Sequence, residues 1–312
     1  MKSLYIALGY ACNHRCIFCP CSSTTPRNMK MSVQEVIDSI ATSITNKDVH
    51  SVLLSGGEPT IQQNFWDILE YLSKTDLSVG ILSNADRLEN RKIVDRILSL
   101  IPPQRLNITT SLHSHNSKKH DKVTQSVGSF NRSLNGVNNL IDAGVNTTIK
   151  HCITKLNYRE MEDFTDFIYN SFIDWVNLLF CSIDYCGIAG ENESVVAVRF
   201  TECGPYIERA LDKVIQYKDN GRLRNTIVTD TPLCAVDPYY WYFFSYHSKE
   251  RIPAYNSPIS GGNMSKLLFD VESDCGTFFN SCKTCIVEQI CPGAWRTACE
   301  LFGEDAVSPI WS

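Results

Sequence analysis

The feature of this chain that most restricts its fold is a regular alternation of strand-like and helix-like segments over the first two-thirds of the sequence. The former are short apolar runs, and the latter carry apolar residues at helical spacing. Since each parallel connection needs a crossover helix, the alternation predicts a parallel sheet and an α/β fold, which we expect to close as a partial (β/α)6 TIM-like barrel. Strands are predicted at 4–9, 50–55, 77–83, 106–112, 146–153 and 174–180, and helices at 32–44, 65–74, 89–101, 130–143 and 158–171.

The pattern changes near residue 190. One more helix is predicted at 201–218, and the chain beyond it is rich in turns, aromatic residues and cysteine. We therefore predict two domains, a barrel over 1–200 and a small C-terminal domain over 201–312. In the aromatic run, Tyr239, Phe243 and Tyr246 share one helical face, which favours core packing over a groove for substrate.

Fourteen cysteines in 312 residues are an unusual number. A core of this size does not need disulfides. No apolar stretch reaches the ~18 residues of a membrane span, and the N-terminal apolar run has no proper signal cleavage site. A lipoprotein signal ending at Cys12 is the alternative. We expect a cytoplasmic protein with reduced, partly metal-bound cysteines, and the net charge of −5 disfavours a nucleic-acid partner.

Three cysteines follow the first predicted strand with the spacing C-x3-C-x2-C, namely Cys12, Cys16 and Cys19. Three thiolates from one loop can bind three irons of a [4Fe–4S] cluster and leave the fourth iron open. Structural zinc is the alternative, and His14 or Cys21 could supply its fourth ligand. Because chemistry in a β/α barrel lies at the carboxyl ends of the strands, this position favours a catalytic centre.

The second predicted strand ends in Ser55-Gly56-Gly57-Glu58-Pro59. Paired glycines let a ligand approach the backbone closely, and Glu58 offers a carboxylate to a cationic group. Taken alone, this motif could be an ordinary turn. On the same edge of the sheet as the three cysteines, it indicates a ligand site.

Together these motifs resemble the radical S-adenosylmethionine (SAM) enzymes. The three cysteines are similar to that family's cluster signature, the glycine turn resembles its site for the SAM amino group, and polar residues after the third and fourth strands resemble its other SAM contacts. The turn Gly187-Ile-Ala-Gly190 is similar to the family's turn after strand six. The positions that carry the cofactor resemblance are Phe18, Gly56, Gly57, Glu58, Pro59, Ser83, Asn84 and Ser111.

One position departs from the family pattern. Many relatives place an arginine shortly after a His-Asp pair that corresponds to His120-Asp121, whereas Val123-Thr124-Gln125 follows here. The resemblance implies that SAM binds the open iron and that an external donor of flavodoxin or ferredoxin type reduces the cluster. Reductive cleavage of SAM would give a 5′-deoxyadenosyl radical that abstracts a hydrogen atom from substrate.

A second cysteine group, Cys282, Cys285 and Cys291, has the spacing C-x2-C-x5-C. Three thiolates again suggest a metal centre, and a zinc knuckle is the alternative. The group resembles the SPASM/twitch auxiliary-cluster domains of the same superfamily. Because Trp295 stands where the SPASM pattern has its next cysteine, one further [4Fe–4S] cluster of the twitch kind is expected, two in all. Cys234 is our choice for its fourth ligand, with Cys299 or Cys275 as alternatives.

The resemblance to twitch and SPASM enzymes favours an oxidoreductase that matures a ribosomally made peptide by crosslinking, thioether formation or epimerisation. The peptide would be held by the C-terminal region or delivered by a separate recognition protein. A small-molecule dehydrogenase or cyclase is the alternative, and a non-catalytic metal-binding or redox-sensing module is an alternative of another class. Hydrogen-donor candidates are Cys152, Cys181 and Cys186, although buried apolar packing is the ordinary role of such thiols. His113, His115 and His120 are expected in a solvated loop.

Overall fold

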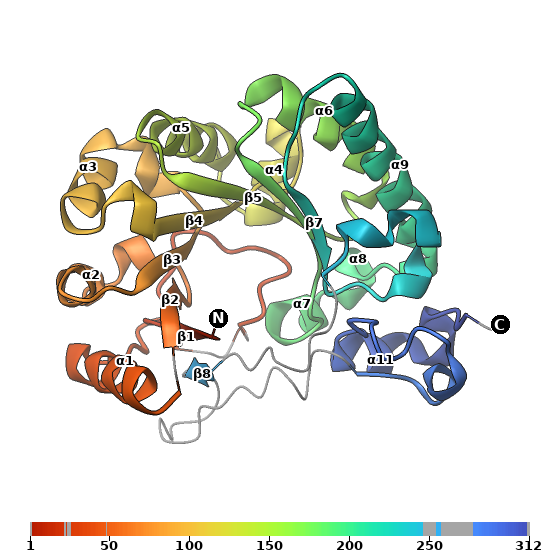
Figure 1. Cartoon of the computed structure of the whole chain (residues 1–312), viewed down its shortest axis with the longest axis horizontal. Coiled ribbons are helices and arrows are strands. Elements are labelled where there is room, and N and C mark those ends of the chain that lie inside the picture. The colour runs from red at the N-terminus through yellow and green to blue at the C-terminus, as the bar shows by residue number, and fades with distance from the viewer. Residues whose placement is uncertain are drawn as a thin grey trace.

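The computed structural model describes residues 2–21, 23, 26–47, 49–245, 254–256 and 277–310. Its centre is one parallel sheet with the strand order β7-β6-β5-β4-β3-β2-β1-β8. Figure 1 shows this sheet curving into an open barrel with helices on its outer side. The strands are β1 (Lys2–Ala7), β2 (Val49–Ser55), β3 (Ser78–Ser83), β4 (Leu106–Ser111), β5 (Asn146–Ile153), β6 (Asn177–Ser182), β7 (Thr226–Thr229) and β8 (Ala254–Asn256).

The helices between the strands carry the crossovers that parallel pairing demands. Ser32 and Glu35 form the reciprocal side-chain cap at the start of α1, as the first turn of an amphipathic helix favours. The helices of the barrel are α1 (Val33–Lys47), α2 (Phe65–Ser73), α3 (Arg91–Leu100), α4 (Ser117–Thr124), α5 (Ser129–Asp142), α6 (Met161–Ser171), α7 (Gly187–Glu191), α8 (Glu193–Val196) and α9 (Phe200–Asp219).

Alternate residues of each strand face opposite sides of the sheet. The outward residues are buried with the helices in two apolar cores, one of which includes Leu4 and Ile6 of β1 and Val52 and Leu54 of β2, and the other Phe180 of β6. The inward residues include hydroxyls, thiols and a lysine. The centre of an ordinary TIM barrel is instead packed with branched apolar side chains. The polar inner wall therefore leaves room for a ligand inside this barrel.

The predicted α/β partial barrel is confirmed, with two corrections. The sheet has more than six strands, because β7 pairs with β6 and β8 pairs with β1. Of the three histidines after β4, only the half-buried His115 fits the expected solvated loop. His120 lies in α4, a helix that the sequence analysis missed, and both His113 and His120 are buried. The low apolar content of residues 117–124 hid the helix, since a short polar segment gives little periodic signal.

The C-terminal segment 277–310 contains α11 (Arg296–Phe302) and short 3-10 helices around a small apolar core. It contacts the carboxyl end of β6, where the indole N–H of Trp295 donates to the Ser182 carbonyl (3.2 Å) and the Thr297 hydroxyl donates to Asp184 (2.5 Å). Elements that follow residue 200 also pack on the barrel, because α9 contacts α6 and β7 pairs with β6. The domain boundary at residue 200 therefore stays a prediction.

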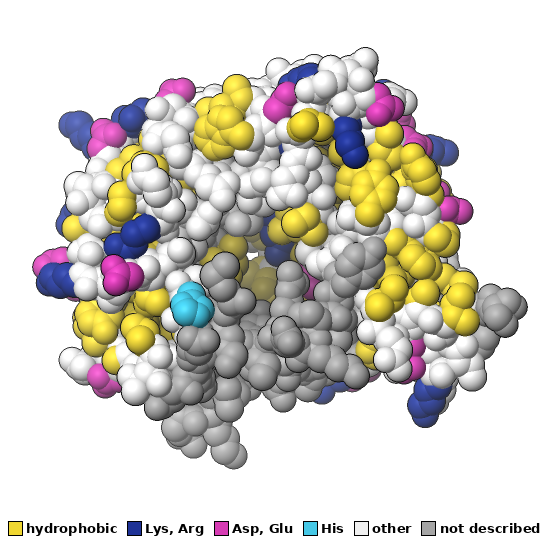
Figure 2. Space-filling model, in the orientation of Figure 1, with side chains coloured by type: hydrophobic (Ala, Val, Ile, Leu, Met, Phe, Trp, Pro, Cys, Tyr) yellow, Lys and Arg dark blue, Asp and Glu magenta, His cyan; other side chains and the backbone are white. Residues whose placement is uncertain are grey.

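The aromatic run forms a 3-10 helix, Pro238–Phe243, in which Phe243 is buried and Tyr239 is 60% exposed. One shared buried face is therefore wrong for Tyr239, and Tyr246 lies outside the described residues. Figure 2 shows the molecule in the orientation of Figure 1. On this side of the molecule, apolar side chains gather over the half that holds the C-terminal segment. Exposed apolar side chains include Tyr239, Tyr242, Ile286 and Ile290. None of the described helices is long and apolar enough to cross a bilayer.

Candidate active site

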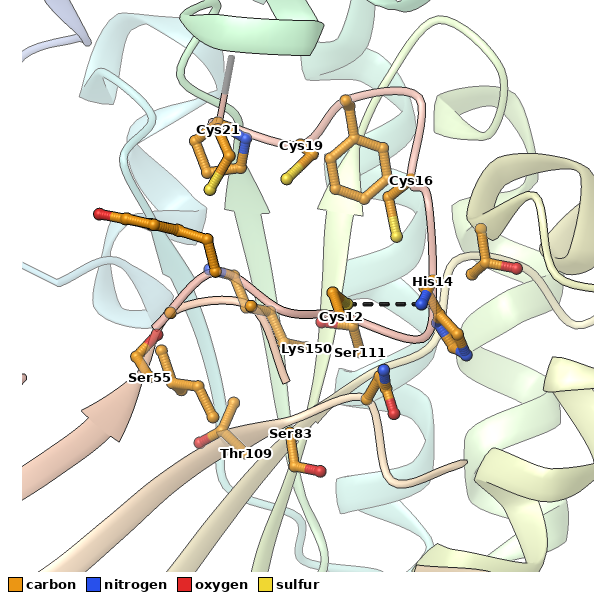
Figure 3. Close-up of a pocket in the computed structure, with 18 of the residues that line it drawn as sticks. Cys12, His14, Cys16, Cys19, Cys21, Ser55, Ser83, Thr109, Ser111 and Lys150 are labelled. Carbon is orange, nitrogen blue, oxygen red and sulfur yellow. Dashed lines mark hydrogen bonds between the residues drawn. The ribbon is translucent and has the colours of Figure 1, made fainter. Parts of the chain in front are cut away.

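A cavity of about 240 Å³ opens at the carboxyl ends of the strands, where β1 passes into the first cysteine loop. Figure 3 shows thiols on one side of it and inward side chains of the strands on the other. Cys12, Cys16, Cys19, Cys21, Phe18, Gly56, Gly57, Ser83, Asn84, Ser111, His113 and Lys150 are among its lining residues. The structure thus brings together the three cysteines and most of the residues that the sequence predicted for SAM.

Backbone hydrogen bonds hold the cysteine loop from two sides. The N–H groups of Arg15 and Ile17 donate to carbonyls at the end of α4 (2.9 and 3.0 Å). The carbonyls of Cys19 and Cys21 accept hydrogen bonds from the first turn of α7 (3.2 and 3.0 Å). The loop is therefore fixed by segments that lie far along the chain from it.

The thiols of this loop are suited to a cluster with several irons. Burial raises the pKa of Cys12 to about 11 and also raises the pKa of Cys16, because a thiolate loses hydration there. A bound metal centre supplies the compensating positive charge and deprotonates its ligands. Among the described residues, no three His, Cys, Asp or Glu side chains converge as one metal ion would require. Three thiols around a larger cavity fit a [4Fe–4S] cluster better than zinc.

The paired glycines pack against the segment that leads into Cys12. The N–H of Gly57 donates to the Gly9 carbonyl (2.8 Å), and the N–H of Glu58 donates to the Ala11 carbonyl (2.9 Å). A Cβ atom on Gly57 would lie 2.2 Å from the Ala11 oxygen, and Gly56 has φ 116°. These contacts explain why both positions are glycine.

Glu58 is 1% exposed, and its carboxylate is used inside the protein. It accepts hydrogen bonds from the Thr60 N–H and hydroxyl (3.1 and 2.6 Å), from the Ser83 hydroxyl (2.9 Å) and from the Asn84 N–H (2.8 Å). Neither Glu58 nor Pro59 is among the residues that line the cavity. The carboxylate ties the end of β2 to the end of β3 and so fixes the cavity floor.

Gly57→Ala should displace the cysteine loop. The added methyl group overlaps the Ala11 carbonyl, so we expect stability to fall by about 1–3 kcal/mol and iron bound at the first site to fall with it. Iron content and urea unfolding measure both effects. Gly144→Ala is the control for backbone strain alone: Gly144 has φ 70°, so alanine there should cost some stability, but its Cβ meets no atom within 4 Å and lies far from the cysteine loop in sequence, so iron content should stay full. Full iron in Gly57→Ala would contradict the expectation.

His14 does not turn its Nε2 atom toward the thiols. This atom lies 2.9 Å from Asp86 Oδ2, and the Arg132 Nε–H donates to Asp86 Oδ1 (2.8 Å). Burial by itself raises the pKa of Asp86, but the hydrogen bonds from His14 and Arg132 outweigh it and lower the pKa to about 2. This ion-paired set holds the cysteine loop to the start of the 3-10 helix after β3.

Asp86→Asn should lower the free energy of unfolding by about 2–3 kcal/mol at neutral pH, because it removes the charge from two hydrogen bonds. The folded-state pKa of Asp86 is depressed, so its stabilising effect is present above about pH 4 and is lost as pH falls toward 2. Urea unfolding of both proteins between pH 7 and pH 3 measures the difference. A difference that stays constant across this range would contradict the assignment.

Sequence reasoning missed Lys150, which lies on β5 beside Ser111 of β4 and reaches into the cavity in Figure 3. The neighbouring Cys181 raises the pKa of Lys150 above its ordinary value, with Cys152 and Asp230 adding to the effect, so the amine stays charged despite burial. The sequence did contain a signal for it. Lys150 precedes the hydrogen-donor candidate Cys152 by two residues in one predicted strand, and residues i and i+2 of a strand face the same side of the sheet.

The three hydrogen-donor candidates differ in position. Cys152 and Cys181 are buried neighbours on β5 and β6, and the Cys181 thiol donates to Asp230 Oδ2 (3.1 Å). Cys186 is half-buried after β6, where its thiol donates to Asp184 (3.1 Å). Cys152 and Cys181 therefore belong to the same wall as Lys150, and Cys186 lies in the segment beside the cysteine loop.

The second cysteine group lines a separate small cavity in the C-terminal region. Cys234, Cys282, Cys285 and Cys291 all contribute to it. Backbone N–H groups point at two of the sulfurs, with Leu233 and Gly293 donating to Cys291 and Ile310 donating to Cys285 (3.4 Å each). Such hydrogen bonds are typical of sulfurs that bind iron–sulfur clusters.

Of the candidate fourth ligands, Cys234 shares this cavity with the other three cysteines. Burial raises the pKa of Cys234 to about 11, and the nearby thiols of Cys291, Cys282 and Cys285 add to the rise. Cys299 lies beside Cys282 but is not among the residues that line the cavity. Cys275 lies outside the described residues.

Comparison with known proteins identifies the family of this chain. The family model described as the radical SAM superfamily matches residues 6–168. Mycofactocin maturase MftC of Mycolicibacterium smegmatis is 27% identical over 158 residues, which are 50% of this chain and 39% of MftC. A probable GTP 3′,8-cyclase of Saccharolobus islandicus is 26% identical over 181 residues, which are 57% of this chain and 56% of that protein. The chain thus matches about two-fifths to just over half the length of these relatives.

Two solved structures show the same fold. Streptococcus suis SuiB bound to precursor peptide SuiA has a TM-score of 0.67 and 16% identity, covering 99% of this chain and 74% of SuiB. AnSMEcpe with bound AdoMet and the Kp18Cys peptide has a TM-score of 0.64 and 14% identity, covering 99% of this chain and 92% of that chain. Taken with the family match over residues 6–168, the chain belongs to the radical SAM superfamily of enzymes, in which a [4Fe–4S] cluster and SAM are the cofactors.

Proposed function

We propose that Cys12, Cys16 and Cys19 hold the family's [4Fe–4S] cluster and that SAM occupies the adjoining cavity. The observation that carries this proposal is the cavity itself, in which the three thiols face a wall of hydroxyl, amide and glycine positions. When bound, these cofactors supply hydrogen-atom abstraction, while the protein positions the substrate and excludes competing reactions. Gly56, Gly57, Ser83, Asn84 and Ser111 would be the protein's contacts to SAM.

Lys150 is our candidate for the residue that binds the carboxylate of SAM. It would take the place of the arginine that many family members have shortly after the position of Asp121 and that this chain lacks. It is charged, it neighbours Ser111, and it lines the cavity. Lys150→Met should weaken SAM binding about tenfold or more, since a charge-assisted hydrogen bond contributes roughly 1.5–3 kcal/mol. Equilibrium dialysis measures the affinity, with Lys150→Arg as the conservative variant. Unchanged affinity in Lys150→Met would assign the carboxylate to another cation, such as Arg27, which also lines the cavity.

The substrate that we propose is a ribosomally made peptide, which the enzyme would crosslink, convert to a thioether or epimerise. The likeness to MftC, whose name is maturase, and to SuiB bound to its precursor peptide supports this choice. The open, polar inner wall and the exposed apolar side chains near the C-terminal segment offer a peptide a place to bind. The similarity to a probable GTP 3′,8-cyclase supports a small-molecule cyclase as the second candidate.

We also propose an auxiliary [4Fe–4S] cluster on Cys234, Cys282, Cys285 and Cys291, because these four thiols line one cavity and backbone N–H groups point at two of them. A separate recognition protein and an external electron donor of flavodoxin or ferredoxin type would complete the reaction. Cys152 and Cys181 would face a substrate bound inside the barrel. They therefore remain our candidates for the thiol that returns a hydrogen atom to the substrate radical.

Anaerobic reconstitution tests the cofactor proposal. Iron and sulfide should each reach about eight per chain for two cubic clusters, and about four would remove the auxiliary one. Reduced protein with SAM should release 5′-deoxyadenosine. Zinc uptake without iron would refute the whole assignment. Incubation with a short peptide encoded beside the gene, and separately with GTP, tests the substrate, because a peptide mass change favours maturation and consumption of GTP favours the cyclase.

A further inference from the structure

The cavity beside the first cluster site contains one thiol more than the family signature requires. Cys21 lines it together with Cys12, Cys16 and Cys19, and Figure 3 shows all four on the cysteine loop around the same space. A cluster whose fourth iron is reserved for SAM needs three thiolates. The fourth thiol therefore requires an explanation.

Cys21 is held in place rather than carried on an unanchored part of the loop. Its carbonyl accepts a hydrogen bond from the Ile188 N–H (3.0 Å). A Cβ atom on Gly187 would lie 2.6 Å from the Cys21 carbonyl carbon, so the start of α7 presses directly against the loop here. Figure 3 shows the Cys19 and Cys21 side chains turned toward the same cavity, which Cys12 also lines. The Cys21 sulfur therefore belongs to the cluster of thiols.

The chemistry of the open iron gives this thiol a role. Thiolate sulfur is the preferred protein ligand of iron–sulfur clusters, and an iron without a protein ligand binds whatever donor is near. Cα atoms two residues apart lie no more than about 7 Å from each other, so Cys19 and Cys21 can serve neighbouring irons of one cluster.

We propose that Cys21 is a displaceable fourth ligand, which binds the open iron as a thiolate when SAM is absent and gives way when SAM binds. The proposal rests on the cluster assignment made above. On binding, the Cys21 S–H proton passes to solvent and one Fe–S bond forms. When SAM arrives, its amino and carboxylate groups take the iron, that Fe–S bond breaks, and the thiolate regains a proton. No electron is transferred in either direction.

This exchange has two consequences. With four thiolates, the resting cluster keeps its fourth iron under oxidation, whereas a cluster with three protein ligands loses it easily. Competition also weakens the apparent affinity for SAM by the fraction of molecules in which the site is open. If Cys21 occupies the iron in about nine molecules of ten, its removal tightens SAM binding about tenfold.

Cys21→Ala is the test, and Cys186→Ala is the matched control. Cys186 is a half-buried thiol beside the same loop, with its sulfur 3.5 Å from the Pro20 carbonyl oxygen, but it is not among the lining residues of the cavity. Reduced proteins are compared by electron paramagnetic resonance with and without SAM. We expect the spectrum of Cys21→Ala to differ from wild type without SAM and to match it with SAM. The auxiliary cluster contributes equally to all samples.

Oxidation by ferricyanide and equilibrium dialysis give independent readouts. Cys21→Ala should yield more [3Fe–4S] signal than wild type or Cys186→Ala, and it should bind SAM about tenfold more tightly. Identical SAM-free spectra, equal [3Fe–4S] yields and equal affinities would overturn the proposal and leave the cluster assignment intact. Absence of iron at this site in wild type would instead refute the assignment. If Cys21→Ala takes up too little iron, Cys21→Ser is measured in the same way, since serine keeps the size of the side chain but binds iron weakly.

Discussion

Cys16→Ala is expected to abolish cleavage of SAM while the C-terminal centre remains loaded. Cys16 is one of three predicted cluster ligands, it is half-buried beside the cavity, and its loop is held on both sides by backbone hydrogen bonds. The reconstituted variant should retain about four irons of the expected eight, and release of 5′-deoxyadenosine should fall to the level of a sample without protein.

Cys152→Ala and Cys186→Ala are the controls for this experiment, because each removes a thiol outside both predicted ligand sets. Both should keep the full iron content and should still release 5′-deoxyadenosine. A Cys16→Ala protein with unchanged iron and undiminished cleavage would refute the assignment of the first loop as the cluster site.

Cys285→Ala is expected to give the opposite division. It should also bind about four irons, but it should still cleave SAM and should fail to complete the product. The reason is spatial, since Cys285 belongs to the separate cavity of the C-terminal region. Iron analysis, 5′-deoxyadenosine release and mass spectrometry of the peptide together measure this division.

The same assay identifies the fourth auxiliary ligand. Cys234→Ala should behave like Cys285→Ala, because Cys234 shares the cavity with the other three cysteines. Cys299→Ala should behave like wild type. If the two variants exchange their behaviour, Cys299 is the ligand, and loss of iron in neither would point to Cys275.

The sequence alone predicted the barrel and the first cysteine site because both depend on local patterns. Strand and helix periodicity reports which face is buried, and C-x3-C-x2-C places three thiols in one loop whatever surrounds them. The same locality explains the start of α9, which was predicted within one residue.

What the sequence did not predict depends on contacts between distant segments. Glu58 was expected to face a cationic ligand, yet donors from Thr60, Ser83 and Asn84 use its carboxylate. That Lys150 lies beside Ser111 depends on the pairing of β5 with β4, and the burial of His120 depends on the packing of α4 against α5. Each of these depends on which strands and helices are neighbours, and a single sequence does not state that.

The anchoring of the cysteine loop has a consequence for how the protein is made. The side chain of Asn192 donates to the Ile17 carbonyl (3.0 Å) across a separation of 175 residues. At a synthesis rate of about 5–20 residues per second, the cysteines leave the ribosome roughly 10–35 seconds before this anchor exists. During that interval the thiols are exposed and flexible, and thiolates bind zinc readily. We therefore expect the loop to select iron over zinc best when the cluster is delivered after the sixth strand has joined the sheet.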